Sequence, residues 1–373
     1  MLKDDIKRCF IPIKIYLEAL CCWPYNRSAF IKFCAWFIFS NMLIAEIFHA
    51  AYVVTNIDDV GGAVGASATV ITSFEALVRM YILLTKQDFI KEILLKVSKQ
   101  FWPFQAISNV DTRNQLRSGV ILSISLPFIY LTCATISTGG YVFMSLRSYQ
   151  LVYISVFPFD WSKRFVYEII YFWQYIINWY NIFMINVFDC FFVSIVAICT
   201  AQFVILQEAL RVIFDEKSRR QRRIIFGMKG GYMTNREVLL KCLEQHKMLL
   251  SICTDLETAL QRATLIQLAV SVNASCSACL MMTIDYSQAA KMLSFGIAHL
   301  IQLFYYCDVC QKLSTESEQL GDAIYESSWH LEYDRDIRRT LILMMQRSQR
   351  KVQMTAVGVM ALNLSTFVRC FSC

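Results

Sequence analysis

The chain has 373 residues, of which 56% are hydrophobic and 17% are charged, and its net charge is +7. A soluble globular domain is about 45–50% apolar and about 25% charged. The composition therefore excludes an ordinary soluble domain and favours a protein with several membrane-spanning segments. We expect membrane lipid to be among its partners, and no nucleic acid.

The first segment, residues 1–32, mixes charged with apolar residues and contains Pro12 and Pro24. Charges at Asp4 and Arg8 interrupt its start, and no apolar core of a secretory signal peptide follows them. We predict a cytosolic N-terminal segment that begins as a short amphipathic lead-in.

Apolar runs long enough to cross a membrane follow, since a spanning helix needs about 20 residues. We predict seven spans, of which the last is the shortest: 33–54, 63–85, 119–140, 166–205, 263–283, 289–310 and 352–368.

Lysine and arginine concentrate in every second connection between these spans. The N-terminal segment has six and the connection 206–247 has ten, whereas the loop 55–62 and the turn 284–288 have none. Basic connections stay in the cytosol. The pattern predicts a cytosolic N-terminus and, with seven spans, an extracellular C-terminus.

Two predicted helices are longer than the bilayer. No proline or glycine interrupts residues 166–215, which as a helix would be roughly 75 Å long against a hydrocarbon core of about 30 Å. In the region 237–283, residues three and four apart repeat the spacing of helix-on-helix packing: Leu239, Cys242, His246, Leu249, Cys253, Leu256 and Leu260. We therefore predict an all-α membrane protein whose long helical extensions form a cytosolic platform.

The predicted organisation has six parts. They are a cytosolic segment at 1–32, spans one to four in 33–205, a cytosolic loop and helical anchor at 206–262, spans five and six in 263–310, a second helical anchor at 311–351, and a short pore-helix segment at 352–373.

Ionisable residues inside spans are candidates for function. Glu46 and His49 lie three apart, and Glu75 and Arg79 lie four apart, so each pair shares one helix face. Each is either a self-satisfied pair packed against a neighbouring helix or a contact for ligand or pore water. Asp189 has no oppositely charged neighbour on its own helix, so a bond to another helix is the expectation for it.

The sequence predicts neither an enzyme nor a metal or cofactor site. Two CxxC pairs, Cys276 with Cys279 and Cys307 with Cys310, have no second pair or histidines nearby, so we interpret them as small packing residues. No catalytic motif of a metalloprotease, serine hydrolase or phosphate-binding loop is present.

The outer end of the fourth span is rich in aromatic residues. An interfacial belt explains the first of them, but Trp179 and Phe183 lie deeper. An apolar ligand pocket would use them, with the hydroxyls of Thr72 and Thr135 to orient a ligand, and helix packing is the alternative. Pro127 should kink the third span, which is compatible with a pocket.

Two sets of motifs resemble the insect odorant receptor family. The order of residues near the C-terminus is typical of that family: Ala323, Tyr325 and Trp329; Met345, Arg347, Ser348 and Gln349; Thr355 and Ala356; Leu364, Thr366 and Phe367. A second set resembles its second extracellular loop: Pro158, Phe159 and Asp160, followed by Tyr167, Tyr171 and Gln174.

The resemblance implies a plasma-membrane protein with seven helices that binds a small volatile ligand. It implies a subunit of a tetrameric, odorant-gated, non-selective cation channel, paired with a co-receptor through the cytosolic helices 237–262 and 320–345. The expected ligand-binding residues lie in the outer half of the bundle: Thr72, Phe74, Tyr130, Thr135, Tyr175, Trp179, Phe183 and Phe295. The expected pore residues are Leu362, Thr366 and Arg369.

The chain departs from the family pattern after Phe367, where six residues follow. A pore helix that starts near Leu362 would be about 18 Å long, shorter than the bilayer core. We therefore expect a defective pore wall and no current from this chain alone. A gustatory-type chemoreceptor is the alternative, and a G-protein-coupled receptor is disfavoured by the predicted topology.

Overall fold

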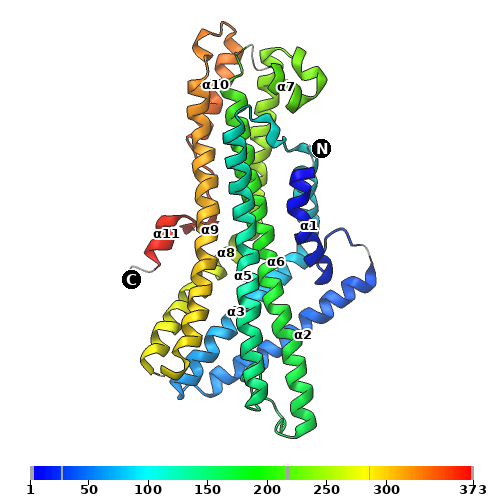
Figure 1. Ribbon diagram of the computed structural model, residues 1–373, viewed down its shortest axis with the longest axis vertical. Helices are drawn as coiled ribbons and strands as arrows, with labels where there is room; N and C mark the ends of the chain where they lie inside the picture. The colour runs from blue at the N-terminus through cyan, green and yellow to red at the C-terminus, as the bar shows by residue number, and fades with distance from the viewer. Residues whose placement is uncertain (1–3, 27, 216–218, 285, 371–373) are drawn as a thin grey trace.

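The protein is an elongated bundle of helices (Figure 1). The structure is a computed structural model and describes residues 4–26, 28–215, 219–284 and 286–370. Its elements are α1 (Asp4–Ala19), α2 (Ala29–Thr55), α3 (Val60–Thr85), α4 (Gln87–Gln100), η1 (Phe104–Ala106), α5 (Val110–Arg147), α6 (Arg164–Arg211), α7 (Arg219–Phe226), η3 (Met228–Tyr232), α8 (Asn235–Ile284), α9 (Tyr286–Glu326), η4 (Trp329–Leu331), α10 (Arg335–Ser348), β1 (Thr355–Ala356), β2 (Met360–Ala361) and α11 (Leu364–Arg369).

Six of the described helices are long and apolar enough to cross a membrane: α2, α3, α5, α6, α8 and α9. They carry the first six predicted spans. Large apolar side chains are exposed along them, among them Phe33, Ile129, Ile169 and Ile297, as expected of helices that face lipid. The prediction of an all-α membrane protein is confirmed.

The expectation of a continuous seventh span over residues 352–368 is wrong. β1 pairs with β2 in an antiparallel hairpin, and α11 begins only at Leu364. The hairpin turns at Val357 and Gly358, both with positive φ, of 53° and 70°. Two consecutive positive φ angles are the signature of a tight hairpin turn, and a β-branched residue rarely adopts one. Hydropathy alone does not separate such a hairpin from a helix.

Helix α6 is the central pillar of the bundle. It has 48 residues, which corresponds to about 72 Å, and every residue from 184 to 203 is buried. Figure 1 shows it running from the lower end of the molecule to the upper end beside α5, α8 and α9.

Beyond the spans, the upper ends of α6, α8 and α9 pack with α7 and α10, and we call this end of the molecule the platform (Figure 1). The seven residues of α8 that were predicted from their spacing to pack against other helices, from Leu239 to Leu260, are all buried. The helical extensions are thus confirmed as packed structure rather than free helices.

A glutamine of α6 holds the connection between α4 and α5. Gln202 accepts a hydrogen bond of 2.7 Å from the Trp102 backbone N–H and donates one of 2.8 Å to the Trp102 carbonyl. Its side chain, at 0% exposure, therefore satisfies both backbone groups of a residue outside any helix.

We expect Gln202→Ala to destabilise the protein, because it orphans two buried backbone groups at about 1–3 kcal/mol each. The midpoint of thermal unfolding of the purified protein in detergent should fall clearly. The exposed Gln319 of α9 provides the control, since Gln319→Ala should leave the midpoint nearly unchanged. Equal midpoints for the two variants would contradict this role of Gln202.

Candidate functional site

A cluster of charged side chains lies buried between the spans. Arg79 of α3 forms ion pairs with Glu75, one turn away on the same helix, and with Asp189 of α6. All three residues have 0% exposure. The predicted Glu75–Arg79 pair is confirmed, but it is not self-contained, because Asp189 shares the guanidinium.

Asp189 receives hydrogen bonds from several directions. Besides Arg79, the Gln302 amide and the Tyr305 and Tyr306 hydroxyls of α9 donate to it, each at 2.6 Å. A buried carboxylate is stable only when it is paired and its lone pairs are satisfied. The expectation that Asp189 bonds to another helix is confirmed, and the donors come from two helices, α3 and α9.

Arg79 extends the same cluster to a fourth helix. Its guanidinium donates to the Ile185 carbonyl at 2.8 Å and to the side chain of Gln267 on α8, and it lies 5.1 Å from the centre of the Phe188 ring. The cluster therefore joins α3, α6, α8 and α9 at one level of the bundle, and we call it the Arg79–Asp189 cluster.

A second polar network ties the loop between α5 and α6 to the bundle. The Tyr153 hydroxyl donates to Asn178 at 2.7 Å, and its ring contacts the His49 ring in a tilted arrangement, with ring centres 4.9 Å apart. Gln174 bonds both the N–H and the carbonyl of Tyr153, at 3.0 and 3.1 Å. His49 also lies 3.8 Å from Glu46, so these two residues on one helix face are paired, and the pair belongs to this network.

The loop motif of the sequence contributes to the same arrangement. The hydroxyls of Tyr167 and Tyr171 donate to the carbonyls of Gln150 and Val142, which fastens the last turns of α5 and the start of the loop to α6. Within the loop, hydrogen bonds from the Ser162 hydroxyl and backbone N–H lower the pKa of Asp160.

Three of the predicted ligand residues form one row along α6. The ring centres of Tyr175 and Trp179 are 6.2 Å apart, and those of Trp179 and Phe183 are 5.9 Å apart. Tyr16 of α1 continues the row at 6.4 Å from Phe183 and 6.1 Å from Phe128 of α5. The row thus lies between α1, α5 and α6, and we call it the aromatic row.

The other predicted ligand residues are more dispersed. The hydroxyls of Thr72 and Thr135 donate to carbonyls of their own helices, Ala68 and Thr132. Phe74 is 50% exposed, and Phe295 packs edge-on against His299, with ring centres 4.6 Å apart.

Tyr130 of α5 is partly buried and packs against the main apolar core of the bundle. Sequence reasoning missed most of the Arg79–Asp189 cluster: it gave no role to Gln267, Gln302, Tyr305 or Tyr306, although glutamines within apolar spans are a usable signal.

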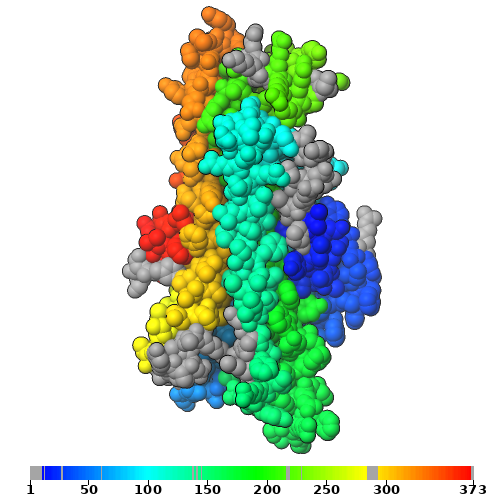
Figure 2. All heavy atoms as spheres, in the orientation of Figure 1, coloured from blue at the N-terminus to red at the C-terminus, as the bar shows by residue number. Residues whose placement is uncertain are grey.

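The predicted pore residues lie on and beside α11. Leu362 and Thr366 are buried, and the Thr366 hydroxyl donates to the Ala361 carbonyl at 2.7 Å. Arg369 is exposed. Phe367 packs edge-on against Phe304 of α9, with ring centres 5.5 Å apart. In Figure 2, α11 stands out from the side of α9, in red.

Comparison with known proteins identifies the family. A family model described as 7tm odorant receptor matches residues 59–373. The chain belongs to the odorant receptor family. The match favours that family over the gustatory-type alternative. Its members are membrane receptors and not enzymes, and this chain is one of them.

Individual relatives are distant. Odorant receptor 85a of Drosophila melanogaster is 24% identical over 163 residues, which is 43% of this chain and 41% of that protein. Odorant receptor 43b of the same species is 21% identical, over 59% of this chain and 54% of that protein. This odorant receptor thus spans about half the length of several curated relatives. Odorant receptor 10 of Aedes albopictus matches more widely, at 23% identity over 79% of this chain and 77% of that protein.

The fold is shared with a solved receptor. The structure of the olfactory receptor OR5 from Machilis hrabei covers all of this chain, with a TM-score of 0.84 at 11% identity, and 97% of that chain is matched. The same receptor in complex with eugenol gives a TM-score of 0.79 at 13% identity and covers 100% and 95% of the two chains.

We expect Arg79→Met to destabilise this odorant receptor by about 3–5 kcal/mol, because it leaves two buried carboxylates without their cation. Adding Asp189→Asn to Arg79→Met should restore part of the loss. Thermal unfolding and the yield of monodisperse protein measure both effects.

Arg211 is the matched control, since its side chain is 34% exposed and pairs with the exposed Glu326 at 2.8 Å. Arg211→Met should cost less than about 1 kcal/mol. If Arg79→Met were as mild as Arg211→Met, the cluster would not be the structural centre described here.

Proposed function

We propose that this chain is an odorant-binding subunit of a ligand-gated, non-selective cation channel in the plasma membrane, assembled with a co-receptor as a hetero-tetramer. The observation that carries the proposal is the whole-chain fold similarity to the receptor OR5 of Machilis hrabei, which was also solved in complex with eugenol. Eugenol is a small aromatic molecule, the kind of volatile ligand that we propose for this chain.

The ligand site that we propose is the outer half of the bundle, between α3, α5, α6 and α9. The aromatic row supports the part of this site next to α5 and α6, because Trp179 and Phe183 offer partly buried ring faces to an apolar molecule. Among the described residues, the Trp179 Nε1–H has no hydrogen-bond partner. This donor is available to a ligand with one acceptor group, and the hydrocarbon part of the ligand would supply the apolar contact.

Helix α9 provides a physical route from ligand to gate. Its Tyr305 and Tyr306 donate to Asp189, while Phe304 contacts Phe367 of α11. A ligand that favours one position of α9 would therefore bias the position of α11 as well. The differential contacts of the ligand with the two positions supply the energy.

The orientation that we propose has the platform in the cytosol. The basic connections of the sequence support it, because the connection that follows the sixth span, residues 312–351, contains seven lysines and arginines. Six described spans return the chain to the side on which it began, so an extracellular C-terminus requires one further crossing beyond α10.

Substitution of the aromatic row tests the ligand site. Trp179→Ala and Phe183→Ala, co-expressed with the co-receptor, should raise the odorant concentration for half-maximal current roughly tenfold, because each removes apolar contact worth about 1.5–3 kcal/mol when fully buried. Phe165→Ala, at an 81% exposed position of the same helix, should leave it unchanged. Current recordings measure the responses, and surface labelling shows that the variants reach the cell surface. If Trp179→Ala and Phe183→Ala responded like the native chain, the aromatic row would not be part of the ligand site.

Tags at the two ends test the orientation. One tag is placed at Lys3 and the other at Cys373, and both positions lie outside the described residues. We expect the N-terminal tag to be labelled only after permeabilisation of the cells, and the C-terminal tag to be labelled on intact cells. Labelling of the N-terminal tag on intact cells would reverse the proposed topology.

A further inference from the structure

A cleft opens between α5, α6 and α9, close to the point where the apolar spans meet the platform. Its volume is about 430 Å³. The apolar part of its wall consists of Leu116, Val120, Ala197, Val204 and Val309, and its polar side chains are Thr112, Gln115, Ser123, Thr200, Lys312 and Glu316. It is distinct from the aromatic row and from the Arg79–Asp189 cluster.

The depth of the cleft follows from the exposed side chains around it. On α9 the apolar positions Ile297 and Ile301 are 46% and 49% exposed, as expected of residues that face lipid, and Asp308 and Lys312 are the charged residues that follow. Headgroups occupy about 5–7 Å on each side of the hydrocarbon core. Lys312, one turn beyond Asp308, therefore lies at the depth of lipid headgroups in the leaflet on the platform side.

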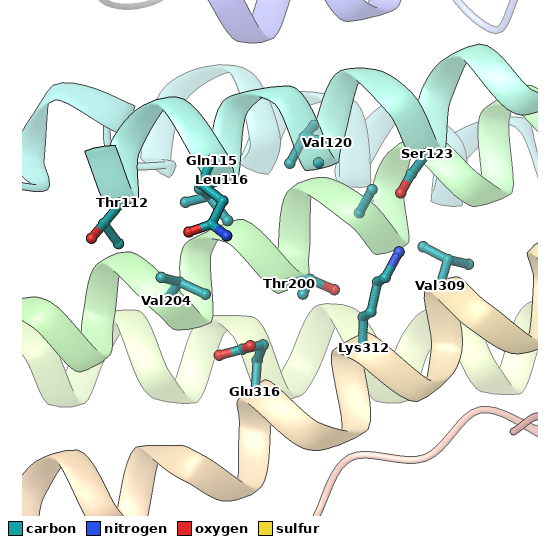
Figure 3. Close-up of a pocket in the computed structure, with 12 residues that line it drawn as sticks. Thr112, Gln115, Leu116, Val120, Ser123, Thr200, Val204, Val309, Lys312 and Glu316 are labelled. Carbon is teal, nitrogen blue, oxygen red and sulfur yellow. The ribbon is translucent and has the colours of Figure 1, made fainter. Parts of the chain in front are cut away.

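Two opposite charges enter the cleft from the same helix. Figure 3 shows the side chains of Lys312 and Glu316 rising from α9 towards α5. They are four residues apart, which places Glu316 about 6 Å farther from the membrane than Lys312. Along the cleft the order is thus apolar wall, cation, carboxylate.

Both charged groups keep capacity for a ligand. Lys312 bonds Asp308 at 2.6 Å, and an ammonium group has three donors. Gln207 donates to the Glu316 Oε2 atom at 3.0 Å, and a carboxylate has about four acceptor sites on its two oxygens. The ion pair with Asp308 therefore does not saturate Lys312, and the hydrogen bond from Gln207 does not saturate Glu316.

We propose that this cleft binds the headgroup of phosphatidylethanolamine. In this lipid an apolar chain is followed by a phosphate and then, farther from the membrane, by a primary ammonium group. This is the order of complementary groups in the cleft: Lys312 meets the phosphate, and Glu316 meets the ammonium. Phosphatidylcholine has no N–H to donate to Glu316, and an anionic headgroup such as phosphatidylglycerol brings no cation to it.

The test is native mass spectrometry of the purified full chain, titrated with short-chain phosphatidylethanolamine, phosphatidylcholine and phosphatidylglycerol. We expect phosphatidylethanolamine to bind roughly tenfold more tightly than phosphatidylcholine, the effect of one charge-assisted hydrogen bond. Glu316→Gln should abolish this preference, and Lys312→Gln should weaken binding of all three lipids.

Two further variants guard against indirect effects. Glu318→Gln removes an exposed carboxylate of the same helix outside the cleft and should keep the preference. Gly119 lines the cleft, and a Cβ atom there meets no heavy atom within 4 Å. Gly119→Leu should therefore fill the cleft and reduce lipid binding without lowering the thermal unfolding midpoint of the lipid-free protein.

Several outcomes would overturn the proposal. Equal affinity of the native chain for phosphatidylethanolamine and phosphatidylcholine would do so, as would a preference that survives Glu316→Gln or disappears in Glu318→Gln. If Lys312→Gln and Glu316→Gln changed the number of associated chains but not lipid binding, the cleft would be a contact between subunits instead.

Discussion

The burial of the Asp189 carboxylate constrains the whole spanning bundle. In lipid, apolar helices gain little from association with one another, because the lipid chains are as apolar as their side chains. Asp189 changes this balance, since its charge must be met by donors from Arg79 of α3 and from Gln302, Tyr305 and Tyr306 of α9. Arg79 in turn binds Gln267 of α8. These contacts fix the mutual depth of four helices.

The sequence could predict the parts of this fold that depend on local spacing. The six spans follow from apolar length, the buried stripe of α8 from its three-and-four repeat, and the Glu75–Arg79 pair from its separation of four residues. The partners of Asp189 could not be predicted, because they are 110 to 117 residues away along the chain. No pattern within one helix specifies which residue of another helix lies opposite.

The same limit explains the failure at the C-terminal segment and the partial result at the ligand site. Apolar composition predicted a helix over 352–368, but the left-handed backbone at Val357 and Gly358 turns it into a hairpin. The aromatic row was found because Tyr175, Trp179 and Phe183 lie four apart on one helix. Its continuation through Tyr16 depends on how α1 packs, which spacing within α6 does not encode.

Helix α6 is the frame to which the other parts are attached, and it uses glutamines for this purpose. Gln174 holds Tyr153 of the α5–α6 loop, Gln202 holds Trp102 before α5, and Gln207 donates to the Glu316 carbonyl of α9 at 2.7 Å. Helix α9 is therefore bound to α6 at two depths, at Asp189 and at Gln207. A slide of α9 along α6 must break both sets of hydrogen bonds together. Because buried donors and acceptors cannot stay unpaired, α9 should move between discrete positions rather than by gradual displacement.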